Sequence, residues 1–159
     1  DLKKPRQERA RATDLNRKRQ RERDSVKERI VREGGLERPS RDDIEKVLLW
    51  EECGGICPYT GKSIAFASLF GEHPQFGVEH IIPFSRLPDN SFQNKTLCDH
   101  EQGRNVKRNK TPFEAYPNTE EYDAILTRIK AWETPNLGKQ KRFELRTLEE
   151  LEGFSTRQL

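Results

Sequence analysis

The chain has 159 residues, of which 36% are charged and 31% are hydrophobic, and its formal net charge is +3. This composition fits one small domain with charged arms and excludes a large apolar core. There is no apolar run long enough for a signal peptide or a membrane span, and the three cysteines are an odd number, so a reducing compartment without disulfides is expected.

The N-terminal segment is strongly basic. Residues 1–32 carry thirteen Lys or Arg and six Asp or Glu, a formal charge of +7 that leaves −4 for residues 33–159. A basic arm beside a mildly acidic body indicates a nucleic-acid neighbour, although a solvated helix has the same composition. Residues 5–32 are good helix formers with few apolar side chains, which predicts a long connector helix that ends at Gly34.

A second helix is predicted from Arg41 to about Cys53. Ser40 followed by Asp43 is a typical helix start, and Gly54 closes the segment. The face predicted to pack on the core consists of Ile44, Val47, Leu48 and Glu51, with Trp50 beside them. A tight turn over residues 57–62 and one apolar helical turn at residues 66–70 follow.

The strongest catalytic signal lies between Phe76 and Pro112. A short apolar run ends in Glu79 and His80, a polar turn follows, and a second short run at residues 95–97 leads into a basic segment. This order predicts strand, loop, strand and helix. Adjacent residues on a strand point to opposite faces, so the carboxylate and the imidazole can do different jobs. An isolated pair of this kind is most often a solvated strand end.

Two further helices are predicted near the C-terminus. Asn118 and Glu121 have the spacing of a capping pattern that opens an amphipathic helix ending at about Glu133. After Pro135 and Gly138, residues 139–151 predict one last helix that leads into an exit linker.

Four motifs in the central stretch occur in a distinctive order. They are Glu79-His80-Ile81-Ile82-Pro83, Asp89-Asn90-Ser91, Asn94-Lys95-Thr96-Leu97 and a basic segment that closes on Thr111-Pro112. This series resembles the HNH nuclease motif, and more narrowly the HNH domain of type II CRISPR RNA-guided DNA endonucleases. The matching core runs from Cys57 to Tyr116. The resemblance implies an α+β fold with a ββα-metal core, in which several helices and the long basic N-terminal helix surround a two-stranded antiparallel sheet.

The ends of the chain resemble the same family. Asp1-Leu2-Lys3 is similar to the end of the segment that precedes the domain, and residues 156–159 are similar to the return into a second nuclease domain. We therefore expect a piece of a larger enzyme. Its predicted parts are a basic linker arm at residues 1–39, the nuclease domain at 40–145 and an exit linker at 146–159.

The resemblance also implies a mechanism with one divalent cation, Mg²⁺ or Mn²⁺, and a histidine general base. His80 is the best candidate for the base because imidazole titrates near neutral pH. Glu79 is expected to bind the metal, since carboxylates suit hard cations. Asn94 corresponds to the middle Asn of the motif and is expected to pin the loop that carries the histidine, because an amide donates and accepts at once.

Two positions depart from the family pattern. Gly103 occupies the place of the helical metal-binding Asn and offers no side-chain oxygen, so Asn105 is the substitute candidate if the helix is locally irregular. Many HNH proteins also carry two Cys-x-x-Cys pairs around a structural zinc. This chain keeps only one cysteine of each pair, Cys57 and Cys98, so buried reduced thiols are favoured over a Zn²⁺ site.

The family implies nucleic acid as the partner. The candidate phosphate contacts are Arg104, Lys107, Arg108, Lys110 and, near the catalytic loop, Arg86. The expected substrate is the DNA strand paired to a guide RNA, and the expected neighbours are the remaining domains of the parent enzyme. The resemblance places such a protein in a bacterial or archaeal cytoplasm, as a monomer that acts in antiviral defence without a membrane.

Two alternatives remain open at this point. The first is a free-standing HNH endonuclease of the restriction or homing type, which acts on duplex DNA. The second is a catalytically impaired nucleic-acid-binding module in which Gly103 records lost catalysis.

Overall fold

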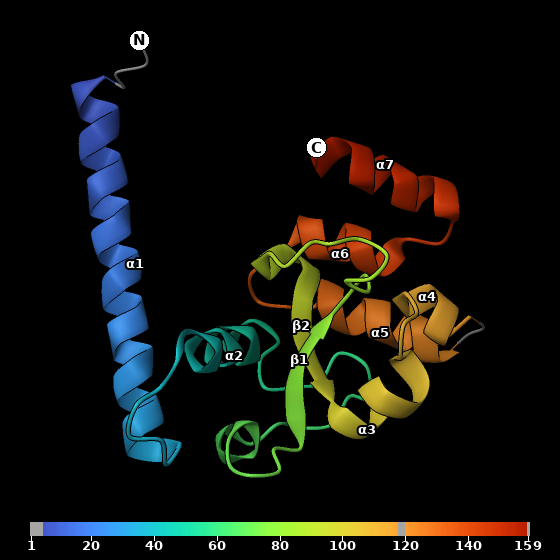
Figure 1. Cartoon of the computed structure of the whole chain (residues 1–159), viewed down its shortest axis with the longest axis horizontal. Helices are drawn as coiled ribbons and strands as arrows, with labels where there is room; N and C mark the ends of the chain where they lie inside the picture. Colours follow the sequence, from blue (N-terminus) through green and yellow to red (C-terminus); the bar gives the residue numbers. More distant parts are fainter. Residues whose placement is uncertain (1–4, 118–119, 159) are drawn as a thin grey trace.

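The computed structural model describes residues 5–117 and 120–158. Its elements in chain order are α1 (Arg6–Glu33), α2 (Arg41–Glu52), the 3-10 turn η1 (Phe66–Leu69), β1 (Phe76–His80), the 3-10 turn η2 (Phe92–Asn94), β2 (Lys95–Asp99), α3 (His100–Gln102), the π-helical turn η3 (Gly103–Lys107), α4 (Pro112–Ala115), α5 (Glu120–Lys130), α6 (Leu137–Glu144) and α7 (Leu148–Gln158). The two strands and the helical segment after them form a ββα core with helices around it (Figure 1). The predicted α+β fold is therefore confirmed. Within the described ranges, no helix has the length and apolarity needed to cross a bilayer.

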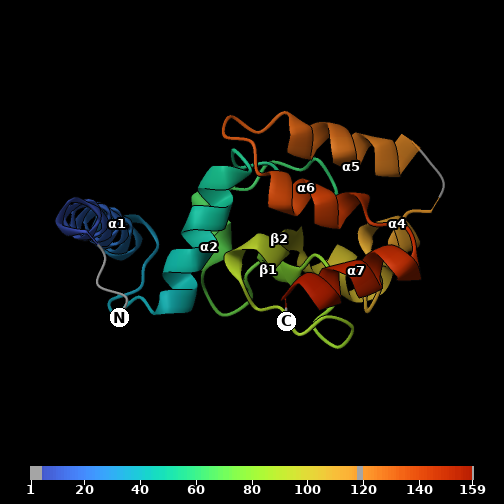
Figure 2. The same ribbon diagram turned by 90° about the horizontal axis from the view of Figure 1, so that it is seen from above.

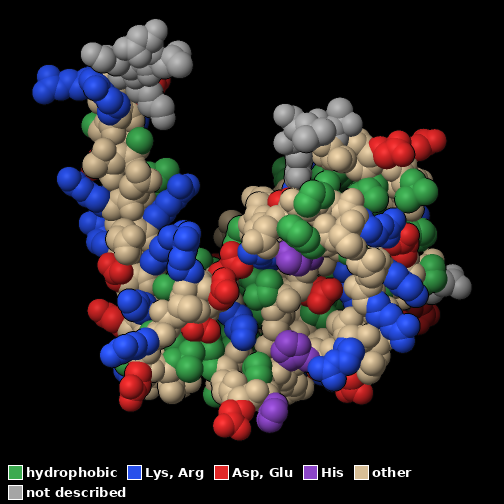
Figure 3. All heavy atoms as spheres, in the orientation of Figure 1, with side chains coloured by type: hydrophobic (Ala, Val, Ile, Leu, Met, Phe, Trp, Pro, Cys, Tyr) green, Lys and Arg blue, Asp and Glu red, His purple; other side chains and the backbone are tan. Residues whose placement is uncertain are grey.

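Helix α1 lies beside the rest of the molecule and meets it near its C-terminal end (Figures 1 and 2). Its buried side chains are Val26 and Ile30, and the guanidinium of Arg29 lies over the rings of Trp50 and Phe66. The N-terminal half is largely exposed, and Lys and Arg side chains project from it (Figure 3). Because so little of this helix is buried, its own helix propensity must hold most of it, as expected for a connector.

Helix α2 begins as predicted, and its predicted face packs on the core except at Glu51. Ser40 and Asp43 form a reciprocal capping box, in which the Ser40 amide donates to Asp43 Oδ2 at 2.8 Å. Val47 and Leu49 are fully buried, whereas Leu48 is half-buried and Glu51 is exposed. The predicted face is thus largely confirmed, since Val47 lies in the core and Ile44, Leu48 and Trp50 pack against it. Glu51 was wrong, and Leu49 is buried in addition because α2 packs on both α1 and β2.

Strands β1 and β2 pair antiparallel. Glu79 lies opposite Thr96, and His80 lies opposite Lys95 at the end of the ladder. The residues of β2 are buried throughout, since helices cover this strand. The sheet thus places the end of β1 at the edge of a packed core, and the loop of residues 81–94 connects the two strands there. We call this segment the β1–β2 loop.

The helix predicted after β2 is irregular. Asp99 caps α3 by accepting hydrogen bonds from the backbone amides of Glu101 and Gln102. After that turn the backbone widens, and the Arg108 amide donates to the Gly103 carbonyl at 2.8 Å, a π-type bond. A π-turn accommodates one extra residue and shifts the register of the side chains that follow.

The C-terminal part differs from the prediction in two respects. Helix α5 ends at Lys130 rather than near Glu133, while the cap predicted at Asn118 lies outside the described residues and stays a prediction. The single helix predicted over residues 139–151 is in fact two helices, α6 and α7. The break occurs because Leu145 is extended and the Thr147 hydroxyl accepts a hydrogen bond from the Glu150 amide, which starts a new helix.

Candidate active site at the end of strand β1

His80 is the last residue of β1, and its ring is held by the β1–β2 loop. The imidazole Nε2 lies 2.9 Å from the side-chain oxygen of Asn90, and the ring packs against Phe84 with 5.5 Å between the centroids. Because the amide oxygen of Asn90 only accepts, Nε2 carries the hydrogen in this arrangement and Nδ1 keeps the lone pair. The sequence motif contained Asn90 but did not indicate this contact.

Asn94 holds the β1–β2 loop from inside. Its side chain is 0% exposed and makes three hydrogen bonds. The amide oxygen accepts from the backbone amide of Ile82 at 3.0 Å, and Nδ2 donates to the carbonyls of Ile82 and Asp89, each at 2.9 Å. These bonds tie the two ends of the loop together. This geometry is what the predicted positioning role of Asn94 requires.

Glu79 is partly buried next to an internal cation. The Lys107 ammonium lies 3.7 Å from Glu79 Oε1 and donates to the His80 carbonyl at 3.0 Å. Burial raises the pKa of Glu79 above its ordinary value, although the charges of Lys107 and His80 act against this rise. Burial likewise lowers the pKa of Lys107, and the neighbouring Glu79 carboxylate opposes that change.

The position of Lys107 corrects the prediction that it contacts phosphate. Its side chain is 0% exposed, so the ammonium cannot reach a bound strand. The π-turn directs this residue into the core, where the carbonyl of His80 and the Glu79 carboxylate compensate its charge. A run of basic residues usually indicates a solvated surface, so no local sequence signal predicts this contact.

The other predicted phosphate contacts divide into two groups. Arg104, Arg108 and Lys110 are exposed. Arg86 is half-buried and forms an ion pair with Glu114, whose carboxylate also accepts from the Thr111 amide. The Arg86 guanidinium is therefore engaged within the chain, which argues against the DNA contact predicted for it.

A hollow of about 220 Å³ lies beside Glu79. It is lined by Gly77, Val78, Glu79, Cys98, Asp99, His100, Gly103 and Arg104. A Cβ on Gly103 would lie 3.2 Å from Glu79 Oε2, so Gly103 faces the carboxylate directly. Asn105 is exposed and is not among the lining residues. The predicted metal-binding role of Asn105 requires this residue to lie next to Glu79, and the π-turn does not bring it there.

His100 also lines this hollow. Its ring lies against Gly77, where a Cβ would come within 2.5 Å of the imidazole. Only glycine allows the ring to approach the strand this closely. His80 does not line the hollow, so the imidazole and the carboxylate leave β1 in different directions, as the alternation of strand side chains requires.

The residues present could hold a divalent cation only if water and substrate oxygens supplied most of its ligands. Over the described ranges, no group of three or more His, Cys, Asp or Glu side chains could hold a metal ion. Glu79 Oε2 faces the hollow, and Gly103 leaves space beside it. Mg²⁺ is often held by one or two carboxylates together with water and substrate phosphate oxygens, and one carboxylate oxygen is available here.

The three cysteines are free and buried. Burial raises the pKa of Cys53 to about 11 and also raises the pKa of Cys98. Neutral thiols in the core are poor metal ligands, because thiolate is the ligating form.

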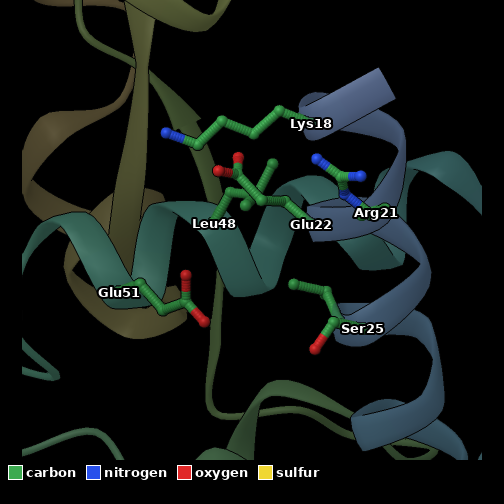
Figure 4. Close-up of a pocket in the computed structure, with 7 residues that line it drawn as sticks. Lys18, Arg21, Glu22, Ser25, Leu48 and Glu51 are labelled. Carbon is green, nitrogen blue, oxygen red and sulfur yellow. The ribbon is translucent and has the colours of Figure 1, made fainter. Parts of the chain in front are cut away.

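A second hollow, of about 420 Å³, lies between α1 and α2 (Figure 4). Its lining is Lys18, Arg21, Glu22, Ser25, Val26, Leu48 and Glu51. The charged groups are of both signs, so they define no single ligand chemistry. None of these residues belongs to the site at the end of β1.

The chain is similar in sequence to known nucleases. Residues 57–113 match a family described as HNH endonuclease. The chain is 35% identical over 115 residues to CRISPR-associated endonuclease Cas9 1 of Streptococcus thermophilus, covering 70% of this chain and 10% of that protein. It is 38% identical over 76 residues to the Cas9 endonuclease of Campylobacter jejuni, covering 48% of this chain and 8% of that protein.

Solved structures show the same fold. A crystal structure of Streptococcus thermophilus Cas9 in complex with the AGAA PAM matches 99% of this chain and 17% of that chain, with a TM-score of 0.71 and 19% identity. The Type II-C Cas9 enzyme from Actinomyces naeslundii matches 96% of this chain and 16% of that chain, with a TM-score of 0.65 and 20% identity. The chain thus spans about a tenth of the length of the curated relatives.

Proposed function

This chain carries an HNH nuclease domain of the kind found in type II CRISPR endonucleases, and from that premise we propose that it hydrolyses a phosphodiester of the DNA strand paired to a guide RNA. The observation that carries the proposal is the arrangement at the end of β1. There a histidine held by the pinned β1–β2 loop and a carboxylate beside a hollow are adjacent in strand β1, so their Cα atoms are about 3.8 Å apart.

His80 is the proposed general base. With Nε2 bound to Asn90, its Nδ1 can take a proton from the attacking water. Asn94 fixes the loop that supplies Asn90, and Lys107 fixes the backbone carbonyl of His80. Holding the imidazole in one orientation contributes to the rate because little motion is then needed before reaction.

Glu79 is the proposed metal-binding residue, with Mg²⁺ or Mn²⁺ as the cation. A divalent cation bound at Glu79 Oε2 would supply positive charge to the phosphate and leaving oxygens. Since Glu79 is the only predicted carboxylate ligand and Gly103 has no side chain, the affinity for free metal should be low. Exposed Arg104, Arg108 and Lys110 are proposed to hold the phosphates of the strand without reading its sequence.

The rest of the chain is proposed to connect this domain to a parent enzyme. Residues 1–39 and 146–159 would be the linkers, and the substrate strand would arrive as an RNA–DNA heteroduplex. The exposed basic surface of α1 supports a place for that arm near nucleic acid or another domain (Figure 3).

A catalytically impaired nucleic-acid-binding module is the second candidate. Two observations favour it: Gly103 offers no ligand, and the Lys107 ammonium already neutralises part of the Glu79 charge.

A cleavage assay separates these functions. The chain, its His80→Ala variant and a His73→Ala control are incubated with Mg²⁺ or Mn²⁺ and a labelled DNA strand, either paired to RNA or in plain duplex. His73 is an exposed loop histidine, so its loss should leave activity unchanged. We expect metal-dependent cutting of the RNA-paired strand that His80→Ala abolishes.

The other results of this assay also have a meaning. Binding without cutting in either metal would support the impaired module, and robust cutting of plain duplex would support a free-standing endonuclease. Activity that survives in His80→Ala would remove His80 as the base.

A further inference from the structure

Helix α6 is joined to the β1–β2 loop by a buried ion pair. Arg142 Nη2 lies 2.9 Å from Asp89 Oδ2, and both residues are 7% exposed. Arg142 Nη1 donates to the carbonyl of Gly138 in its own helix, but its Nε is buried and finds no hydrogen-bond partner among the described residues. Burying a guanidinium with one N–H unsatisfied costs free energy, so its contact with Asp89 must offset that cost.

Asp89 directly precedes Asn90, the residue that contacts the His80 imidazole. Its Oδ1 accepts from the Ser91 amide at 3.0 Å, and its carbonyl accepts from Asn94 Nδ2 at 2.9 Å. Backbone on both sides of Asn90 is thereby fixed, and Asn90 in turn holds His80 Nε2. Arg142 is thus connected to the imidazole through the Asp89 side chain, the backbone between Asp89 and Asn90, and the Asn90–His80 hydrogen bond.

Helix α7 contacts the same arginine through Phe154. The ring of Phe154 lies 5.2 Å from the Arg142 guanidinium carbon. The two helices lie at the end of the sheet where the β1–β2 loop runs (Figure 1). A small hydrophobic cluster, separate from the main core, joins α7 to the β1–β2 loop. It consists of Ile82, Leu87, Leu145 and Leu151, with Phe154 packed against it.

We propose that Arg142 is a positioning residue, which holds Asp89 and thereby orients Asn90 and the His80 imidazole, and that α7 supports it as an integral part of the nuclease unit. The segment predicted as an exit linker would then also influence the site from within the nuclease unit. The effect of Arg142 on catalysis rests on the proposed function, whereas its effect on the orientation of His80 does not.

The test uses the full chain with four substitutions. Arg142→Met removes the ion pair, Arg142→Lys keeps the charge, and Phe154→Ala removes the contact from α7. The matched control is Glu52→Gln, which breaks the other buried ion pair of α6, between Lys139 and Glu52, on the side of α2. That pair is buried like Arg142–Asp89 but makes no hydrogen bond to Asp89 or Asn90 that the structure records.

The first measurement is the ¹⁵N-NMR signal of the His80 ring. The bond to Asn90 should keep the Nε2 hydrogen in slow exchange with water. We expect Arg142→Met to speed this exchange at least tenfold, Arg142→Lys to restore it in part, and Glu52→Gln to leave it unchanged. Phe154→Ala should give an intermediate change.

The second measurement is the rate at which each variant cuts the RNA-paired DNA strand. Misplacing a catalytic group by about 1 Å can cost roughly a hundredfold in rate, so kcat should fall about 10- to 100-fold in Arg142→Met while KM stays the same. An unchanged His80 signal in Arg142→Met, or an equal change in Glu52→Gln, would overturn the proposal.

Two further results are informative. If Arg142→Met does not fold, Phe154→Ala decides: it removes a partly exposed side chain, and wild-type exchange of His80 in this variant would overturn the proposal. If the unmodified chain cuts no DNA, the proposed function fails on its own, because the NMR measurement still tests the positioning of His80.

Discussion

The ammonium of Lys107 donates a hydrogen bond to the backbone carbonyl of His80 at 3.0 Å from a fully buried position. Lys107 was predicted as part of a basic surface cluster, but its charge lies inside the protein, next to the proposed base. It holds the end of β1 in place and lies beside Glu79, whereas Arg104, Arg108 and Lys110 are exposed to solvent.

Replacing Lys107 should affect stability rather than DNA affinity. Lys107→Met leaves the His80 carbonyl and Glu79 without their partner, which should lower the free energy of unfolding by about 1–3 kcal/mol. Lys110→Met is the matched control, since Lys110 is exposed. It should change stability by less than about 0.5 kcal/mol but reduce the salt dependence of DNA binding by about one charge. Urea denaturation and DNA titrations at several salt concentrations measure both effects, and the opposite pattern would contradict the buried placement.

A ligand added at Gly103 should strengthen metal binding. An Asn there would place an amide oxygen next to Glu79 Oε2, and the Cβ distance of 3.2 Å requires only a small movement of that flexible carboxylate. One added ligand contact worth about 1.4 kcal/mol would raise the Mn²⁺ affinity about tenfold. Gly103→Ala, which adds the Cβ without an oxygen, should give no gain. Titration followed by electron paramagnetic resonance compares the three chains, and equal affinities would argue against a site at Oε2.

Arg108 has a backbone conformation that favours glycine. Its φ of 45° and ψ of −132° directly follow the π-turn, and no other described non-glycine residue has a positive φ. Strain of this kind costs about 1–3 kcal/mol, and glycine adds about 0.5–1 kcal/mol of backbone entropy loss. Arg108→Gly should therefore raise the free energy of unfolding by about 1 kcal/mol, visible as a higher Tm. Lys110→Gly, without positive φ, should lower it.

The three cysteines should be unreactive in the folded chain. All are buried, and burial raises the pKa of Cys53 to about 11, so little thiolate exists at pH 8. Ellman's reagent should label all three thiols in guanidinium chloride and none within minutes under native conditions. Rapid labelling of the native chain would show that the core opens around Cys53.

The raised pKa of Glu79 gives a pH dependence with a definite sign. In the folded chain, burial keeps this carboxyl protonated to a higher pH than in the unfolded chain. Its favourable contribution is therefore complete below the ordinary Glu pKa and is lost as the pH rises through the raised value. Both the unmodified chain and Glu79→Gln are measured in EDTA. Relative to the variant, the unfolding free energy of the unmodified chain should fall between the ordinary Glu pKa and the raised pKa of Glu79, and then level off. A difference that grows with pH would mean that Lys107 outweighs burial.

Local sequence patterns determined much of this structure. Capping residues fixed the start of α2, glycines ended α1, and short apolar runs around a polar turn gave the two strands. These features depend on residues a few positions apart, so sequence spacing is enough to predict them. The same pattern also placed Glu79 and His80 together at the end of a strand.

Tertiary structure decided which side chains surround those two residues. Lys107 lies 27 positions from His80, and Arg142 lies 53 positions from Asp89, so no local spacing connects them. The π-turn also escapes prediction from local spacing, since its last residue, Lys107, is held by contacts with His80 and Glu79 of β1. The sequence thus named the proposed base and metal-binding carboxylate, but burial and long-range charge pairing settled which cations lie within the protein and which remain available to a nucleic acid.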